Sequence, residues 1–162
     1  MGTFQTLSFY EMMMTYLLGI LSQAIPSSLD QILPSGHNYT TYLAASYVKW
    51  VEGAGARAAP IIVSDNEDNL DYYDEVTMKA LTMLTLALIF HPPKMFAGIN
   101  GLLIPGGAVS IYSSPYATAA TYLVDLARLS NEAGDVFPVW GTCLGFEMLG
   151  AISTGGEPYL AR

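Results

Sequence analysis

The only cysteine of the chain, Cys143, lies between two glycines in the run Gly141-Thr142-Cys143-Leu144-Gly145. This G-x-C-x-G spacing is the cysteine counterpart of the G-x-S-x-G nucleophile elbow, a sharp turn from a strand into a helix. Glycines let neighbouring backbone approach closely, and the helix that follows points its free N–H groups at the sulfur, which favours the thiolate. The spacing therefore predicts a nucleophilic cysteine, and the alternative is a buried, unreactive thiol.

A cysteine that attacks a carbonyl needs donors for the oxyanion that forms. The N–H of Leu144, directly after the cysteine, would face that oxygen. A second donor must come from a neighbouring loop, and the Gly106–Gly107 turn follows a short apolar strand. Because parallel strands bring their carboxyl ends to one edge of a sheet, we expect the two turns to meet there. Loss of one such donor typically lowers the rate about a hundredfold or more.

The elements that must position these turns alternate between strands and helices. The apolar and turn-forming residues predict strands at 15–23, 57–65, 99–104 and 136–140, with helices at 39–54, 114–135 and 141–153. Residues 22–38, rich in proline and serine, are expected to form a loop. Apolar rather than alternating strands favour an α/β domain with a mainly parallel sheet flanked by helices.

The two longer expected helices each present an apolar face at helical spacing. We expect the first to bury its aromatic residues as core, and the second to turn its inner face to the sheet. The first face comprises Tyr39, Tyr42, Leu43, Ser46, Tyr47, Trp50, Val51 and Ala54, and the second Ala119, Tyr122, Leu123, Leu126, Ala127 and Leu129.

Composition excludes several functions. The 162 residues are 52% hydrophobic and 12% charged, with a formal net charge of −8. The few lysines and arginines are scattered singly, whereas nucleic-acid binding needs a clustered basic surface. The longest apolar run, Ala80 to Phe90, is shorter than the roughly 20 residues that span a bilayer. The acidic stretch at 65–75 lacks the spacing of a calcium-binding loop and is interpreted as a solvated loop.

Several stretches resemble the class I glutamine amidotransferase-like superfamily, and within it the γ-glutamyl hydrolase family. They are "LLGILSQ", "YLAASYVKWVEGAGARAAPI", "INGLLIPGGAV" and "GDVFPVWGTCLGFEML". The resemblance implies a flavodoxin-like topology and a Cys–His–Glu triad acting through a thioester, with no metal or cofactor. It implies cleavage of γ-linked glutamates from folyl- and antifolyl-poly-γ-glutamates. By resemblance Cys143 is the nucleophile, and the N–H groups of Gly107 and Leu144 form the oxyanion hole.

Glu147 distinguishes the hydrolases from their relatives, since amidotransferases usually carry Gln four residues after the nucleophile. The resemblance places Glu147 in the substrate site. The alternative is an acid in the first turn of a helix, favoured there by the helix dipole and needing no function.

Two features depart from the family pattern. The family's catalytic His and Glu lie in a His-Pro-Glu motif well past the elbow, and no such motif follows Cys143 up to Arg162. The "FHPPK" stretch at 90–94 precedes the cysteine and has proline where the acid should be, so we reject His91 as the base. We therefore expect residues 1–162 to form a single partial domain, incomplete at the C-terminus, with little or no hydrolase activity alone.

The second departure is the apolar segment Thr77 to Met95, which has no counterpart in the family pattern. We expect an insertion there, of gene-model or intron origin; the alternative is a lineage-specific helix. The family is lysosomal, vacuolar or secreted, although no basic signal-peptide region is visible at the N-terminus. The other hypotheses are a glutaminase domain of amidotransferase type and a non-catalytic isoform that pairs with full-length subunits. A homodimer is also considered.

Overall fold

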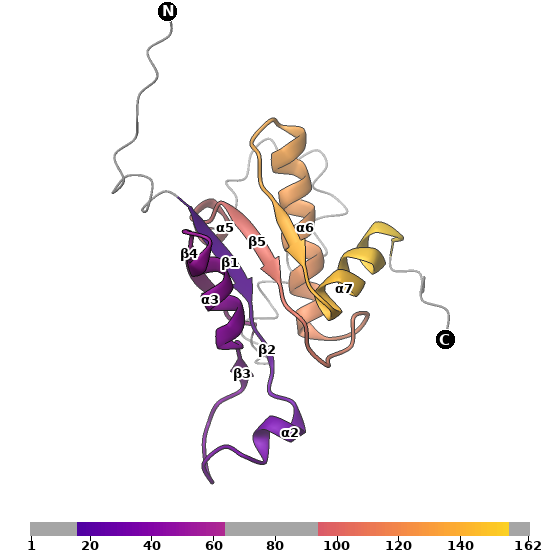
Figure 1. Cartoon of the computed structure of the whole chain (residues 1–162). Coiled ribbons are helices and arrows are strands. Elements are labelled where there is room, and N and C mark those ends of the chain that lie inside the picture. The colour runs from indigo at the N-terminus through magenta and orange to yellow at the C-terminus, as the bar shows by residue number, and fades with distance from the viewer. Residues whose placement is uncertain (1–15, 64–93, 156–162) are drawn as a thin grey trace, which may run out of the picture.

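The computed structural model describes residues 16–63 and 94–155. A parallel four-stranded sheet in the order β4-β1-β5-β6 forms its centre (Figure 1). Its strands are β1 (Leu17–Leu21), β4 (Arg57–Ile61), β5 (Gly101–Ile104) and β6 (Val139–Gly141). The expected α/β fold with a mainly parallel sheet is confirmed, and the strand order is that of flavodoxin-like folds.

The sheet is apolar because helices cover both of its faces. All four residues of β5 are buried. Leu103 of β5 and Ile20 of β1 pack toward one face, whereas Leu102 and Ile104 pack in the larger core on the other. Strands that are buried on both faces consist of continuous apolar residues. This explains why these strands do not alternate between apolar and polar residues in the sequence.

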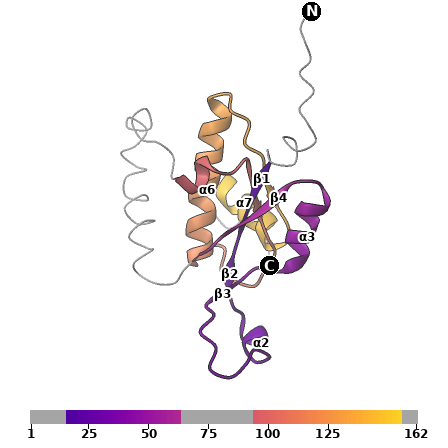
Figure 2. The ribbon, with the colours of Figure 1, turned by 90° about the vertical axis from the view of Figure 1, so that its left-hand side faces the viewer.

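The helices divide between these two faces. Figure 2 shows α3 (Ala45–Gly53) on one side of β1 and β4, and α6 (Pro115–Glu132) on the other. The short helix α5 (Lys94–Ala97) and helix α7 (Leu144–Ser153) join α6 in the larger core. Helix α6 starts where the sequence favours it, because Ser114 accepts a hydrogen bond from the N–H of Ala117 and a proline follows at the first helical position.

The inner face of α6 is largely as the spacing predicts. Ala119, Leu123 and Ala127 are buried, and Tyr122 and Leu126 pack partly buried against them. The prediction for Leu129 is wrong, since its side chain is 40% exposed. It lies in the last turn of the helix, which ends at Glu132.

The first expected helix is shorter than its apolar spacing predicts. Residues Thr41–Tyr42 form the short strand β3, which pairs antiparallel with β2 (Gln23–Ala24), so the helix begins only at Ala45. The prediction that its aromatics are core is wrong for Tyr39, 61% exposed, and Trp50, 52% exposed. Pairing with β2 offers the backbone of residues 41–42 an alternative to helical hydrogen bonds.

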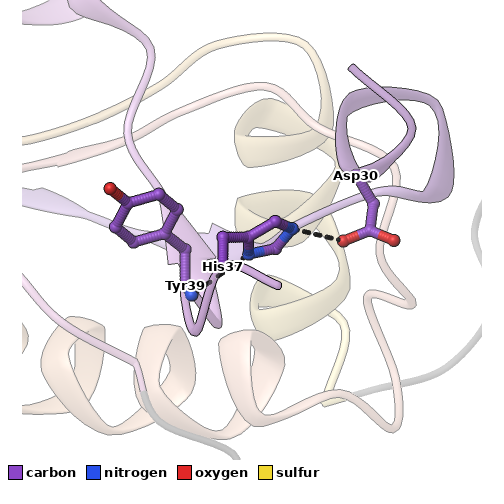
Figure 3. A network of polar contacts seen from close by, with 3 residues as sticks. All are labelled: Asp30, His37 and Tyr39. Atoms are coloured by element: carbon purple, nitrogen blue, oxygen red, sulfur yellow. Dashed lines mark hydrogen bonds and ion pairs between the residues drawn. The ribbon is translucent and has the colours of Figure 1, made fainter. Parts of the chain in front are cut away.

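Residues 25–40, between β2 and β3, form an excursion that projects past the sheet and carries the short helix α2 (Ser27–Asp30) (Figure 1). Figure 3 shows the contact that holds it. His37 Nε2 lies 3.0 Å from Asp30 Oδ1, and His37 Nδ1 accepts a hydrogen bond from the N–H of Tyr39. The His37 and Tyr39 rings stack with centroids 5.4 Å apart. Both ring nitrogens of His37 are therefore engaged within the excursion.

Several expectations fall outside the described residues. The acidic stretch at 65–75 and the Ala80 to Phe90 run lie there, as does the expected insertion at 77–95 up to residue 93. The last two residues of that insertion, Lys94 and Met95, open helix α5. Within the described ranges, no helix is both long enough and apolar enough to cross a membrane.

Candidate active site

The strand order places the expected ligand-binding edge of the sheet at the carboxyl ends of β1 and β5. Strand β1 has β4 on one side and β5 on the other, so the chain changes direction between them. In open α/β sheets ligands bind at this switch point. Strand β6 is paired so that Gly141 lies opposite Ile104, the last residue of β5. The turn after β5 and the turn after β6 therefore start side by side.

Cys143 occupies a strained turn between β6 and α7. Its backbone angles are φ 52° and ψ −114°. In the described ranges it is the one non-glycine residue with a positive φ. Such a backbone costs roughly 1–3 kcal/mol and persists where the surroundings impose it. The cysteine is free and exposed, and α7 begins at the next residue. The alternative of a buried thiol is therefore wrong, and the reactivity of Cys143 stays a prediction.

The two glycines of the elbow are required by the close approach of backbone atoms. A Cβ on Gly145 would overlap the carbonyl oxygen of Ile104, and one on Gly141 would lie 2.5 Å from the carbonyl oxygen of Gly145. The N–H of Thr142 donates to Ile104 O at 3.0 Å, which ties the elbow to the end of β5. Backbone packed on backbone in this way holds Cys143 in its strained conformation.

The turn after β5 lies directly against the cysteine. A Cβ on Gly106 would be 2.9 Å from Cys143 Cβ, so the structure brings the two turns together as the sequence predicts. In the part of the chain that is described, the N–H groups of Gly107 and Leu144 donate no hydrogen bond. Neither N–H is therefore committed to an acceptor within the described residues. Their role as an oxyanion hole remains a prediction.

Three side chains at these turns have no functional role predicted from the sequence, although Tyr47 is expected on an apolar helix face. The Tyr47 hydroxyl accepts a hydrogen bond from the N–H of Gly106 at 2.9 Å. Gln23 Nε2 donates to the carbonyl oxygens of Pro105 and Gly106, and the Tyr116 hydroxyl donates to Pro105 O at 2.7 Å. Burial raises the pKa of Tyr116 well above its usual range, which keeps its hydroxyl protonated as a donor. Tyr47 and Gln23 belong to the stretches that carry the family resemblance, and that was the only available signal.

Glu147 lies in the first turn of α7, one turn beyond the cysteine. Its side chain is partly buried, and its N–H donates to the carbonyl oxygen of Cys143 at 3.1 Å. This position is compatible with either interpretation of the residue, as a substrate contact or as an acid favoured by the helix dipole. Its role remains a prediction.

A general base for Cys143 is not found among the described residues. His37 has both ring nitrogens engaged, with Asp30 and with the N–H of Tyr39. His91 lies outside the described ranges. Within those ranges there is also no group of three or more His, Cys, Asp or Glu side chains that could hold a metal ion. The described site thus contains an exposed cysteine next to backbone N–H groups that have no acceptor within the described residues.

Comparisons with known proteins identify the relatives of this chain. No protein-family model matches it. It is 35% identical to human gamma-glutamyl hydrolase over 139 residues, which are 86% of the chain and 35% of the human protein. It is 43% identical to bovine gamma-glutamyl hydrolase over 108 residues, 67% of the chain and 27% of that protein. Gamma-glutamyl hydrolase B of Dictyostelium discoideum is 37% identical over 134 residues, 82% of the chain and 31% of that protein.

The chain thus spans about a third of the length of the curated relatives it matches. The similarity covers most of its own residues, as the quoted stretches predict. Together with the parallel sheet, the strained cysteine turn and the adjacent glycine turn, it establishes that the chain belongs to the γ-glutamyl hydrolase family.

Proposed function

We propose that this chain carries the nucleophile side of a cysteine-dependent γ-glutamyl hydrolase that acts on folyl-poly-γ-glutamates. The observation that carries the proposal is the exposed Cys143 in its strained turn, with free N–H groups of Gly107 and Leu144 beside it. A nucleophile at a helix N-terminus with two backbone donors nearby is the arrangement that acyl transfer requires.

In the proposed reaction the Cys143 thiolate attacks the γ-carbonyl carbon, forming an S–C bond and a tetrahedral oxyanion. The N–H groups of Gly107 and Leu144 stabilise that oxyanion. Its collapse breaks the C–N bond, leaving a thioester, and the amine departs with a proton from the general acid. Water then attacks the thioester, the S–C bond breaks, and the thiol is regenerated. Glu147 is proposed to contact the substrate.

The proton transfers need a histidine that the described residues do not supply. The family resemblance assigns this role to a His with a Glu partner in a segment downstream of the elbow. His37 does not take it over, because both of its ring nitrogens are bonded in the excursion. We therefore propose that the 162-residue chain by itself has little or no turnover.

One experiment separates acylation from turnover. A γ-thiophenyl ester of N-benzoylglutamate acylates a cysteine without a general acid, since thiophenolate leaves unprotonated. We expect intact-mass analysis to show one acyl adduct on the wild type and none on Cys143→Ala. The α-thiophenyl ester is the matched control and should react at least about tenfold more slowly, because discrimination of this size is within reach of a binding pocket. Equal labelling by both isomers would contradict γ-glutamyl specificity.

Turnover is tested separately with a folyl-poly-γ-glutamate as substrate. We expect the 162-residue chain to release no shortened product above background when followed by chromatography. Robust release that is lost in Cys143→Ala would disprove the proposed inactivity. It would at the same time support Cys143 as the nucleophile.

We further propose that residues 1–162 form a single partial domain, with an insertion at 77–95. The support is that strands from residue 17 to residue 141 share one sheet. A lysosomal, vacuolar or extracellular location is proposed on the family resemblance. It is tested by fusing a fluorescent protein to the chain's C-terminus in its natural genomic context and imaging against organelle markers.

A second candidate is a non-catalytic role through association with a complete subunit or with another copy. In the described sheet β6 has β5 as its only neighbour, and Trp140 of β6 is exposed beside Trp50 of α3. An open strand edge with exposed aromatics favours pairing. Size-exclusion chromatography with light scattering is run on the chain alone and on a mixture with the complete protein. A hetero-dimer in the mixture or a dimer of the chain alone supports this role, and a monomer in both contradicts it.

A further inference from the structure

The turn from Pro105 to Gly107 is held by side chains from three different elements. Tyr47 on α3 accepts the Gly106 N–H at 2.9 Å, and Tyr116 on α6 donates to Pro105 O at 2.7 Å. Gln23 on β2 donates to Pro105 O at 3.2 Å and to Gly106 O at 3.1 Å. Every polar backbone group of Pro105 and Gly106 therefore has a hydrogen-bond partner. The next N–H along the chain, that of Gly107, has no acceptor within the described residues.

Gln23 differs from Tyr47 and Tyr116 because its position leaves one of its own polar atoms buried without a hydrogen bond. It is only 2% exposed, and its Oε1 is buried without a hydrogen-bond partner in the described part of the chain. The orientation of the amide is fixed, since only its NH₂ group can donate to two carbonyl oxygens. The cost of an unpaired buried acceptor is comparable to the gain from a pair of hydrogen bonds. The unpaired acceptor thus offsets much of the stability that the two hydrogen bonds contribute.

The same amide defines the backbone of Gly107. A Cβ on Gly107 would overlap Oε1 and the amide carbon of Gln23, so the side chain lies against the Cα of this glycine. The amide thus bonds to the two carbonyls before Gly107 and also fills the space that a side chain at 107 would need. Both contacts restrict rotation of the Gly106–Gly107 peptide, whose N–H is the predicted oxyanion donor.

We propose that Gln23 is a positioning residue that aims the Gly107 N–H at the oxygen of an acyl group on Cys143. This inference rests on the proposed acyl-transfer function. In this proposal Gln23 acts through the peptide that it holds. A donor must be held within a fraction of an ångström to stabilise an oxyanion fully, and the fixed amide meets that requirement.

The test measures the binding of aldehydes to the 162-residue chain. An aldehyde adduct places an oxygen at the proposed oxyanion position, and it forms without a general base. The Cys143 sulfur adds to the aldehyde carbon, an S–C bond forms, the C=O π bond opens, and the thiol proton goes to oxygen. That oxygen then occupies the proposed site. We compare butyraldehyde with an N-benzoylglutamate analogue that carries an aldehyde at the γ position, and measure each dissociation constant by intrinsic fluorescence.

The informative variant is Gln23→Met, which keeps the shape of the side chain but removes both donors. We expect its affinity for both aldehydes to fall roughly tenfold or more, since misplacement of a catalytic group by about 1 Å can cost a hundredfold. The rate of Cys143 alkylation by iodoacetamide should change less than about twofold, because direct displacement at carbon forms no oxyanion. Equal aldehyde affinities in a folded Gln23→Met variant would overturn the proposal.

Ser22→Ala is the matched control. Ser22 adjoins Gln23, is equally buried, and accepts a hydrogen bond from the N–H of Val63 at 2.8 Å rather than touching the turn. Its loss should lower stability but leave aldehyde affinity unchanged. A fall in affinity equal to that of Gln23→Met would assign the effect to general loosening and overturn the proposal.

A measurement on the wild type keeps the proposal testable if Gln23→Met does not fold. In protein labelled with ¹⁵N-glycine, butyraldehyde should move the Gly107 amide proton downfield, as expected for a new hydrogen bond to oxygen. An unmoved Gly107 resonance at saturating aldehyde would overturn the proposal. If instead the γ-aldehyde binds no better than butyraldehyde while Gln23→Met weakens both, γ-glutamyl specificity fails and the positioning role of Gln23 stands.

Discussion

Two regions of the molecule are stabilised in different ways. One is the pair of turns after β5 and β6, and the other is the excursion at residues 25–40. At the two turns, backbone packs on backbone: Gly145 lies against the end of β5, and side chains form hydrogen bonds with the polar backbone groups of the facing turn. In the excursion the side-chain contacts centre on His37, which lies between an exposed Asp30 and the N–H of Tyr39 (Figure 3), alongside local backbone hydrogen bonds. A local sequence pattern predicts the backbone conformation well where close backbone contacts allow only one conformation. It predicts the conformation poorly where a few side-chain polar contacts determine it.

The largest effect is expected from Gly145→Ala. The added Cβ overlaps the carbonyl oxygen of Ile104, and neither backbone can move without breaking the β5–β6 register. We expect a loss of about 3 kcal/mol or more in the free energy of unfolding, at the upper end of overpacking effects. Urea denaturation followed by circular dichroism measures it.

Gly53→Ala is the control for this substitution. Gly53 ends α3, and a Cβ there meets no atom within 4 Å. Alanine is favoured over glycine in a helix, so stability should rise by up to about 0.5–1 kcal/mol. Equal losses in the two variants would contradict the view that backbone contact restricts position 145.

Tyr116→Phe tests one side chain of the turn. It removes the hydrogen bond to Pro105 O, and we expect a loss of about 1 kcal/mol at neutral pH, as for a typical buried hydrogen bond. Burial raises the pKa of Tyr116 above its usual 10.0, so the unfolded chain loses this proton first as pH rises. Stability of the wild type should therefore fall as pH rises past about 10, and less steeply in the variant.

Urea denaturation of both proteins from pH 8 to pH 11 measures this difference. Below pH 10 Tyr116 keeps its proton in both the folded and the unfolded wild type. The difference in free energy of unfolding between the wild type and Tyr116→Phe, called the gap here, should therefore be constant there. Above it the gap should narrow. A gap that widens with pH would show that Tyr116 ionises more easily in the folded protein and would contradict its buried, donating role.

The smallest effect is expected from Asp30→Asn in the excursion. Exposed ion pairs contribute about 0–1 kcal/mol, and the amide oxygen can still accept from His37. We expect a change within about 0.5 kcal/mol, together with faster amide hydrogen exchange confined to residues 25–40. A loss as large as that of Gly145→Ala would remove the contrast between the two regions.

Sequence reasoning located the turns but not the side chains that hold them. The G-x-C-x-G spacing and the Pro-Gly-Gly turn are local patterns with a single physical cause each, and both lie where expected. Gln23, Tyr47 and Tyr116 come from three elements far apart in the sequence, so their convergence on one turn depends on how the strands and helices pack. No spacing rule connects residues 23, 47 and 116.

The expected helix at 39–54 shows the same limit. Its aromatic spacing is helical, yet Thr41–Tyr42 pairs with Gln23–Ala24 and Tyr39 stacks on His37 in the excursion. Helical periodicity reports which residues could share a face, while the competing β2–β3 pairing is a non-local contact. The burial of Val51 and the exposure of Trp50 follow from which part of α3 meets the sheet.

The sequence by itself determined the fold class, the family and the position of the strained cysteine, because these depend on continuous apolar runs and on glycine spacing over a few residues. Only the tertiary structure decided which backbone N–H groups remain free beside Cys143 and which side chains occupy the others. That outcome depends on β2, α3 and α6 meeting at the end of β5, and such convergence is produced by packing rather than by any segment alone.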